Sequence, residues 1–291
     1  MRITDFDIYR DLLKERSGLV LTQDKAYLVE SRLGPVAKKW EFASLEAMTG
    51  ALQAVPDKNL VNDIIEAMTT NETSFFRDIK PFDLFRDTVL PYMLKNRVNQ
   101  RKIKIWCAAA SSGQEPYSLA MVTKEQGSVF SGWDISIKAT DISSDILDQA
   151  RNGVYSQFEV QRGLPITMLM KHFTQDDEKW RLNDDIRKMI QFEYFNLLDS
   201  MAALGTFDII FCRNVLIYFD EETKAQIFEK MSKIIAPDGF LFLGGAETVL
   251  GITDTFKPVK EKRGLYVTKD NQFDAEPGTE QAAKSTQAIA Q

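Results

Sequence analysis

The first 80 residues carry apolar side chains at helical spacing. Phe6, Tyr9 and Leu13 fall on one face of a first helix, which Gly18 ends. Further helices are predicted over residues 24–40, 44–53 and 57–69. This pattern predicts an all-helical N-terminal domain spanning residues 1–80.

From about residue 100 the pattern changes to apolar runs that alternate with amphipathic stretches. Strands are predicted at residues 102–110, 134–141, 190–198, 207–214 and 240–247. Helices are predicted at residues 115–127, 143–153 and 220–235. Residues 237–239, Pro-Asp-Gly, predict a turn, and residues 256–269 predict a closing hairpin. Alternation of this kind implies an α/β domain over residues 81–268, with a mostly parallel sheet and helices on both faces.

Two stretches depart from this rhythm. Residues 155–190 contain short strand-like pieces and no long helical pattern, so we expect a small antiparallel insertion there. Residues 269–291 are polar and small, which predicts a disordered tail.

The composition is that of an ordinary globular protein, with 44% hydrophobic and 27% charged residues in a chain of 291. A net charge of −6 disfavours general nucleic-acid binding. The two cysteines, Cys107 and Cys212, lie in apolar runs and are expected to be buried thiols rather than a disulfide. No apolar run approaches the length of a membrane span, and the N-terminus does not resemble a signal peptide. We therefore expect a cytoplasmic protein that does not insert into membranes.

The candidate chemistry lies where the predicted strands end, because ligands of open parallel sheets bind beyond the carboxyl ends of the strands. Polar residues at these positions are Glu115, Asp141, Asn196, Arg213 and Asn214. The first strand-to-helix turn reads "AAASSGQE" and lacks the G-x-G-x-x-G pattern, which disfavours a nicotinamide dehydrogenase.

The acid at the start of the first helix of this domain narrows the ligand class. A carboxylate there is stabilised by the helix dipole and would repel a pyrophosphate. The predicted ligand is therefore a nucleoside without phosphates, preferably with a positive charge, and S-adenosylmethionine meets that description. These residues favour a class I S-adenosylmethionine-dependent methyltransferase with a Rossmann-like fold. A Rossmann-like domain with ordinary polar loops remains the alternative.

Segments in register along the chain resemble one family. "TTNETSFFRD" (69–78), "IWCAAASSGQEPYSLAM" (105–121) and "FDIIFCRNVLIYFD" (207–220), with "ATDIS" (139–143) and "FNLL" (195–198), are similar to the CheR family of chemotaxis receptor methyltransferases. The resemblance covers about residues 5–268. It implies methyl transfer from S-adenosylmethionine to glutamate side chains of chemoreceptors, with S-adenosylhomocysteine as product. It also implies a helical domain, a methyltransferase domain and a small inserted β-subdomain.

The resemblance also implies a set of site residues. The cofactor contacts map onto Asn71, Thr73, Arg77, Glu115, Asp141, Asn196, Leu197, Arg213 and Asn214. Tyr218 matches a tyrosine beside the transferred methyl group, and is the candidate catalytic residue. The planar guanidinium of Arg77 suits the cofactor's carboxylate, and Leu197 is suited to lie against the adenine. Glu115 and Asp141 suit the amino and ribose ends, and the sequence leaves open which acid takes which end.

This chemistry needs no catalytic base. A glutamate with a pKa of about 4.3 is already ionised at neutral pH, so the enzyme has only to desolvate and aim it. The chain's one histidine, His172, lies outside every motif and is expected on the surface or in the insertion. Tyr218 is expected to orient the substrate carboxylate through its hydroxyl, or to pack near the sulfonium through its ring. The alternatives are a non-catalytic S-adenosylmethionine-binding adaptor and a small-molecule methyltransferase.

Two expectations concern the receptor partner. The family suggests that a basic helix surface carrying Arg32, Lys38 and Lys39 meets the acidic helical bundle of the receptor, although a solvated face is the ordinary interpretation. Some family members also bind a peptide at the receptor's C-terminus through a glycine-containing loop of the β-subdomain. Here that stretch, "FTQDDEKWRL" (173–182), is short, acidic and without glycine, so we expect no dependence on such a tether.

Overall fold

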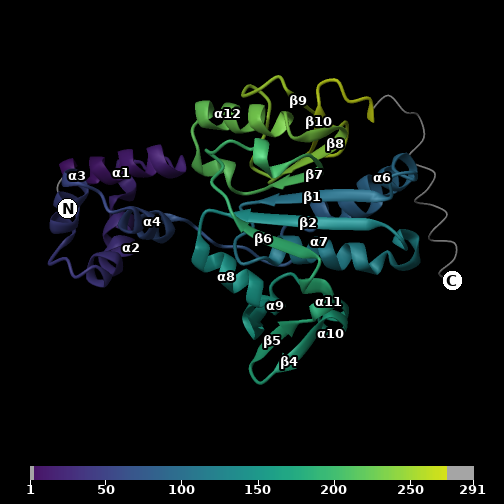
Figure 1. Cartoon of the computed structure of the whole chain (residues 1–291), viewed down its shortest axis with the longest axis horizontal. Helices are drawn as coiled ribbons and strands as arrows, with labels where there is room; N and C mark the ends of the chain where they lie inside the picture. The colour runs from purple at the N-terminus through teal and green to yellow at the C-terminus, as the bar shows by residue number, and fades with distance from the viewer. Residues whose placement is uncertain (1–2, 274–291) are drawn as a thin grey trace.

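The computed structural model describes residues 3–273 and shows a helical domain beside one end of a central sheet (Figure 1). The helical domain contains α1 (Ile3–Ser17), α2 (Ala26–Lys39), α3 (Leu45–Ala54) and α4 (Lys58–Met68). Its core buries Tyr9, Leu13, Leu33 and Ile64 completely, as the helical spacing predicts. None of the helices within residues 3–273 combines the length and the apolar character that crossing a bilayer requires.

The central sheet has the strand order β6-β2-β1-β7-β8-β10-β9. Its strands are β1 (Lys102–Ala108), β2 (Asp134–Asp141), β6 (Ile190–Tyr194), β7 (Phe207–Cys212), β8 (Ile235–Leu243), β9 (Phe256–Pro258) and β10 (Leu265–Thr268). The pairs among β6, β2, β1, β7 and β8 are parallel, and β10 runs antiparallel to β8 and β9. The predicted, mostly parallel α/β sheet is confirmed.

Alternate residues of the central strands face two different cores. In β1, Ile105 and Cys107 pack into one core, whereas Trp106 and Ala108 pack into the other. The first core is shared with α5 (Lys80–Leu84), a π-helical turn (Phe85–Val89), α6 (Leu90–Asn96) and α7 (Gln114–Glu125). The second is shared with a 3-10 turn (Leu216–Tyr218) and α12 (Glu221–Ser232), while α8 (Ser144–Asn152) packs near β2 and β6. Both cysteines are buried thiols, as expected.

One local prediction is wrong. Residues 237–239 do not form a turn that precedes the strand, because β8 begins at Ile235 and runs through them. The pairing of β7 with β8 shifts register at this point. A Cβ at Gly239 would lie 2.8 Å from the carbonyl oxygen of Asp208, so only glycine allows the two strands to approach here. A Pro-Asp-Gly sequence thus marks an irregular strand rather than a chain reversal.

The predicted antiparallel insertion is a separate three-stranded sheet below the main sheet, beside α8 (Figure 1). It contains β3 (Val154–Ser156), α9 (Gln157–Gln161), α10 (Ile166–His172), β4 (Phe173–Asp176), β5 (Lys179–Leu182) and α11 (Asp184–Arg187). His172 lies in this subdomain, almost fully buried, with Nε2 2.7 Å from Glu125 Oε1. This contact joins the subdomain to the end of α7.

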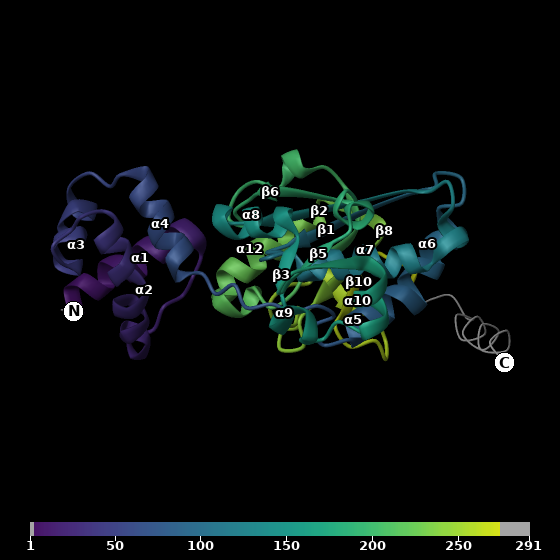
Figure 2. The same cartoon turned by 90° about the horizontal axis from the view of Figure 1, so that it is seen from below.

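The helical domain meets the carboxyl edge of the sheet at several polar contacts, and the chain leaving α4 crosses to the second domain as an extended segment (Figure 2). Lys14 forms an ion pair with Asp220, and its ammonium also donates to Thr223 Oγ1 at 2.8 Å. The backbone N–H of Val20 donates to the carbonyl of Tyr218 at 2.9 Å. The α1 end of the helical domain therefore touches the loop that carries the candidate catalytic tyrosine.

The folded chain continues a few residues past the predicted boundary at residue 268. Phe273 is buried, with its ring 5.1 Å from Tyr92 and 4.9 Å from Phe240, both in edge-on contacts. The rest of the predicted tail, residues 274–291, lies outside the described residues.

Candidate active site

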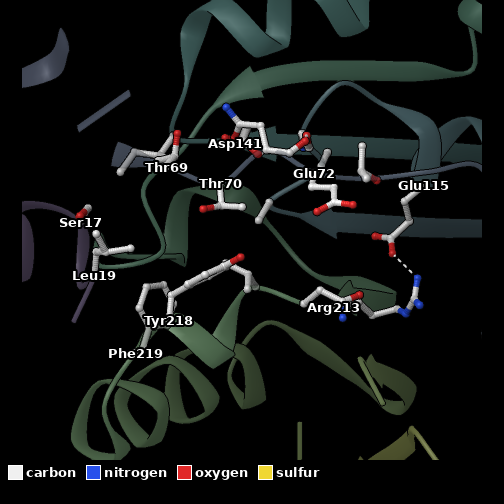
Figure 3. Close-up of a pocket in the computed structure, with 18 of the residues that line it drawn as sticks. Ser17, Leu19, Thr69, Thr70, Glu72, Glu115, Asp141, Arg213, Tyr218 and Phe219 are labelled. Carbon is white, nitrogen blue, oxygen red and sulfur yellow. Dashed lines mark hydrogen bonds and ion pairs between the residues drawn. The ribbon is translucent and has the colours of Figure 1, made fainter. Parts of the chain in front are cut away.

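A cleft opens at the carboxyl edge of the parallel strands, where the two domains meet (Figure 3). Its volume is about 840 Å³ with the open mouth included. Its walls come from the connecting segment (residues 69–79), the β1–α7 turn, the ends of β2 and β7, and the 3-10 turn. Eight predicted site residues line it: Asn71, Thr73, Arg77, Glu115, Asp141, Arg213, Asn214 and Tyr218. Residues that are up to 147 positions apart in the sequence, from Asn71 to Tyr218, thus line one cavity.

The β1–α7 turn has a strained backbone. The φ angles are 56° at Ala109, 50° at Ser111 and 92° at Gly113. Non-glycine residues seldom adopt positive φ, and such residues cluster at functional turns. At Gly113 an added Cβ would lie 3.0 Å from Tyr117 and 3.1 Å from Ala150, so a side chain has no room. This turn brings the chain sharply from the end of β1 into the helix that carries the first acid of the site.

Asp141 ends β2 and holds the turn in place. Its Oδ2 accepts a hydrogen bond from the Ser111 N–H at 2.8 Å, and its Oδ1 accepts one from the Ser143 N–H at 3.0 Å. Burial raises the pKa of Asp141, and the backbone hydrogen bonds oppose this rise. Each carboxylate oxygen has a second lone pair, so Asp141 keeps acceptor capacity toward the cleft. That capacity suits the hydroxyls of a ribose.

Glu115 is not an isolated anion. Its Oε2 accepts a hydrogen bond from Arg213 Nη1 at 2.8 Å across the cleft wall (Figure 3). Burial raises the pKa of Glu115, and the charge and hydrogen bond of Arg213 oppose that rise. The sequence predicts both residues at the site but does not predict that they pair.

Arg213 links three parts of the site. Its side chain is 1% exposed, and its Nη2 donates to the Arg77 carbonyl at 2.9 Å and to Asp78 Oδ2 at 2.7 Å. The guanidinium also lies over the Phe82 ring, 5.6 Å from its centre. A desolvated charge needs such partners, and losing one is costly. Arg213 therefore ties the connecting segment to Glu115 and forms part of the wall.

The connecting segment is itself strained. Phe76, Asp78 and Ile79 have φ angles of 50°, 68° and 52°. The Ser111 hydroxyl donates to the Asn71 carbonyl at 2.7 Å, which ties this segment to the β1–α7 turn. Strain of this kind persists only where surrounding contacts fix the backbone, and it places the segment across one side of the cleft.

Two predicted cofactor residues are not among those that line the cleft. The Asn196 Nδ2 donates to the Arg16 carbonyl at 2.7 Å, and its Oδ1 accepts from the Leu198 N–H at 3.0 Å. Its amide thus joins the end of α1 to the loop after β6. Leu197 is buried in the core that contains Trp106. Their roles toward the adenine stay predictions.

Glu247 is a site residue that the sequence reasoning missed. Its carboxylate accepts backbone hydrogen bonds from Asn214 at 2.8 Å, Val215 at 3.0 Å, Leu216 at 2.7 Å and Gly244 at 2.7 Å. It therefore fixes the chain that leads from Asn214 to the 3-10 turn. A sequence pattern that could have identified Glu247 is an acid shortly after two glycines at the end of a strand. Gly244 has no side chain, which lets the carboxylate of Glu247 reach the backbone.

Tyr218 ends that 3-10 turn, and its hydroxyl points into the cleft (Figure 3). Its ring packs against the second core. Ser17 and Leu19, from the end of α1, line the cleft near it. The sequence gives no signal for these two, since they come from the other domain.

The residues of the cleft fit S-adenosylmethionine. Three acids line the cleft, the buried Glu115 and Asp141 and the exposed Glu72, with hydroxyl and amide groups beside them. Arg77 Nη1 donates a hydrogen bond to the Glu72 carbonyl at 2.9 Å, and the other N–H groups of its guanidinium remain able to donate to a ligand. Apolar wall comes from Ile142, Val215 and Phe219. This set can bind an amine, a carboxylate and a ribose together.

Comparison with known proteins agrees with this geometry. Residues 71–265 match the family model described as CheR methyltransferase, SAM binding domain, and residues 4–69 match CheR methyltransferase, all-alpha domain. A chemotaxis protein methyltransferase of Vibrio parahaemolyticus is 41% identical over 263 residues, which cover 88% of this chain and 94% of that protein. Chemotaxis protein methyltransferases of Pseudomonas putida and Pseudomonas aeruginosa are 38% and 39% identical over 267 residues, covering 90% of this chain and 96% of each.

The fold and the site define a class I S-adenosylmethionine-dependent methyltransferase. The chain belongs to the CheR methyltransferase family. The predicted family, fold class and cofactor are therefore confirmed.

Proposed function

We propose that this chain methylates glutamate side chains of chemoreceptors, forming methyl esters. The observation that carries the proposal is the cleft itself, which gathers cofactor-binding groups and the hydroxyl of Tyr218 at an open edge. The relatives in Vibrio and Pseudomonas are named chemotaxis protein methyltransferases, which supports a receptor as substrate. An open edge suits a side chain presented on a protein surface.

The residues of the chain have separate roles in this reaction. When bound, S-adenosylmethionine supplies an electrophilic methyl group on a sulfonium. Arg77 binds its carboxylate through planar guanidinium donors, and Glu115 and Asp141 hold its amino and ribose groups. Burial of Glu115 and Asp141 beside the connecting segment excludes water from the reacting end.

No residue needs to act as a base. The acceptor glutamate is ionised at neutral pH. His172 lies in the inserted subdomain against Glu125, outside the residues that line the cleft. Tyr218 orients the acceptor carboxylate through its hydroxyl. Replacing Tyr218 with Phe should therefore lower kcat while leaving affinity for S-adenosylhomocysteine unchanged; full turnover would show that the hydroxyl does not orient the acceptor.

The reaction is tested by incubating the full chain with tritiated S-adenosylmethionine and cytoplasmic fragments of receptors. The expected result is label on glutamate that is released as methanol by mild base. Arg77→Met serves as a matched control, because it removes the cofactor clamp at the rim of the cleft and should abolish the label. Label only on a small molecule would favour the alternative activity, and binding without transfer to any fragment would favour an adaptor.

The structure reduces the number of α2 residues that we propose to contact the receptor. The Arg32 guanidinium donates to the Met68 carbonyl at 2.9 Å and the Thr69 carbonyl at 3.1 Å, and Lys39 pairs with Asp63 at 2.8 Å. Lys38 is exposed, so it is the residue of the three best placed to meet an acidic bundle. Lys38→Glu should weaken receptor methylation at low salt, and an unchanged rate would remove this contact.

We also propose that methylation does not require a receptor tether peptide. The turn between β4 and β5 is short and carries Asp177 and Glu178, which with Asp176 at the end of β4 have charges that repel a peptide carboxylate. Calorimetry with a peptide matching the receptor's C-terminus should show no binding, and a micromolar complex would contradict the proposal.

A further inference from the structure

A short basic hairpin lies beside the cleft, on the same edge of the sheet. It joins β9 to β10 and carries Lys260, Lys262 and Arg263, which we call the basic hairpin. Because β10 runs antiparallel to β8, the turn before β10 sits next to the end of β8, and the Leu243 N–H donates to the Gly264 carbonyl at 3.0 Å. This edge is the carboxyl edge of the parallel strands, where the cleft opens.

A short chain of hydrogen bonds connects the basic hairpin to the cleft wall. Arg263 Nη2 donates to the Gly245 carbonyl at 3.0 Å. The neighbouring Gly244 N–H donates to Glu247, whose same Oε2 accepts from the Asn214 N–H at 2.8 Å. Asn214 lines the cleft two residues before the turn that ends in Tyr218. The hairpin is therefore one loop away from the reacting end.

The positive charge of the basic hairpin is not balanced by an ion pair in the part of the chain that the structure describes. Within residues 3–273, no carboxylate forms an ion pair with Lys260, Lys262 or Arg263. Lys260 and Arg263 are exposed, and Glu261 is the one acid between them. In a chain of net charge −6, this makes a local positive surface beside the site of reaction.

Exposed apolar side chains accompany these charges. Leu250 is 66% exposed in the loop after β8, and Ile217 is 47% exposed next to Tyr218. The surface formed by the basic hairpin and these two loops thus combines apolar side chains with ammonium and guanidinium groups. A helix that presents carboxylates beside apolar side chains is the complementary surface.

We infer that the basic hairpin binds the acidic side chains that flank the acceptor glutamate on the substrate helix. This inference rests on the proposed function, because it takes a receptor glutamate as the acceptor. The hairpin steers and holds the anionic helix, while the cleft residues hold the cofactor. Its charge therefore lowers the KM for the receptor and leaves cofactor affinity unchanged.

The test uses the full chain with Lys260 and Lys262 both replaced by Glu, which leaves the Arg263–Gly245 bond intact. Its matched control replaces Arg101 and Lys104 by Glu, two exposed basic residues at the opposite edge of the sheet. Methyl transfer to a receptor fragment is measured at ionic strengths of about 0.03 M and about 0.3 M. Circular dichroism and S-adenosylhomocysteine calorimetry verify that each variant is folded and binds the cofactor product.

The expected result for the hairpin variant is a rise of about tenfold in the receptor KM at low ionic strength, shrinking at high ionic strength. Its kcat and its affinity for S-adenosylhomocysteine should match the wild type. A receptor KM equal to that of the control variant overturns the inference while the proposed function stands. A wild-type enzyme that labels no receptor glutamate overturns the proposed function, and the inference with it.

Discussion

Glu247 offers the sharpest test of how the site is built, because Gln has nearly the same side-chain shape and differs only in one terminal group. Glu247→Gln replaces one carboxylate oxygen by an amide NH2. Oε1 accepts from Val215 and Leu216, and Oε2 accepts from Asn214 and Gly244. The amide can serve one of these pairs and must point its own donors at the other. Two backbone N–H groups, one buried and one partly buried, then lose their acceptor.

The size of the effect follows from these bonds. A hydrogen bond to a charged group contributes about 1.5–3 kcal/mol, so losing two corresponds to about 3–6 kcal/mol. Total stabilities are about 5–15 kcal/mol, so this is a large share. Movement of the 214–218 loop recovers part of this free energy, and that movement displaces Tyr218. We therefore expect the unfolding free energy to fall by about 2–5 kcal/mol and kcat to fall at least about tenfold.

Urea denaturation measures the first quantity and tritium transfer to a receptor fragment measures the second. Glu222→Gln, an exposed acid on α12, is the matched control and should change neither. Since Glu247 acts through the loop, kcat should fall more than the affinity for S-adenosylhomocysteine. A Glu247→Gln enzyme with wild-type kcat and a loss below about 1 kcal/mol would refute the role assigned to these four bonds.

Other predictions follow from single contacts. Arg213→Met should cost about 3–5 kcal/mol in urea denaturation, because it leaves Glu115 buried and unpaired; wild-type stability would mean that the pair contributes nothing. Asp141→Asn should weaken S-adenosylhomocysteine binding at least about tenfold by calorimetry, and an unchanged affinity would exclude Asp141 from the site. The hydrogen bond from Lys171 lowers the pKa of Glu125 below its ordinary value of 4.5. The ionised acid therefore stabilises the fold at pH values above 4.5, and this contribution is lost as the pH falls through the lowered pKa. Glu125→Gln should therefore lower the unfolding free energy at neutral pH by less than about 1 kcal/mol after solvent screening, which lowers the melting temperature, and should match the wild type in acid; equal melting temperatures at neutral pH would contradict the assignment.

Local patterns were enough to predict the elements of the fold. The helical spacing of Tyr9 and Leu13 identifies a core helix, and the apolar runs around Cys107 and Cys212 identify buried central strands. Residues at the carboxyl ends of these strands are then expected to meet, because the carboxyl ends of parallel strands lie at the same edge of the sheet. This is why the sequence predicts Glu115, Asp141 and Arg213 at one edge of the sheet, and all three line the cleft.

Contacts between distant positions could not be predicted from the same patterns. The pair of Glu115 and Arg213 joins residues 98 positions apart, and the bond from Asn196 to Arg16 joins residues 180 positions apart. Spacing rules describe neighbours along a helix or strand and say nothing of such pairs. The turn predicted at Gly239 failed for the same reason, because the contact that requires this glycine comes from Asp208 on the next strand.

The structure also changes the physical reason for excluding a phosphate. Repulsion by a bare Glu115 is not sufficient, since Arg213 neutralises much of that charge. Two N–H groups in the backbone of the turn supply a further reason. Phosphate-binding turns point free N–H groups at their ligand, but here the Ser111 N–H donates to Asp141 and the Gly113 N–H donates to the Ala110 carbonyl at 3.0 Å. A diphosphate would have to break both bonds, whereas a ribose and an ammonium use the remaining acceptors of the two acids.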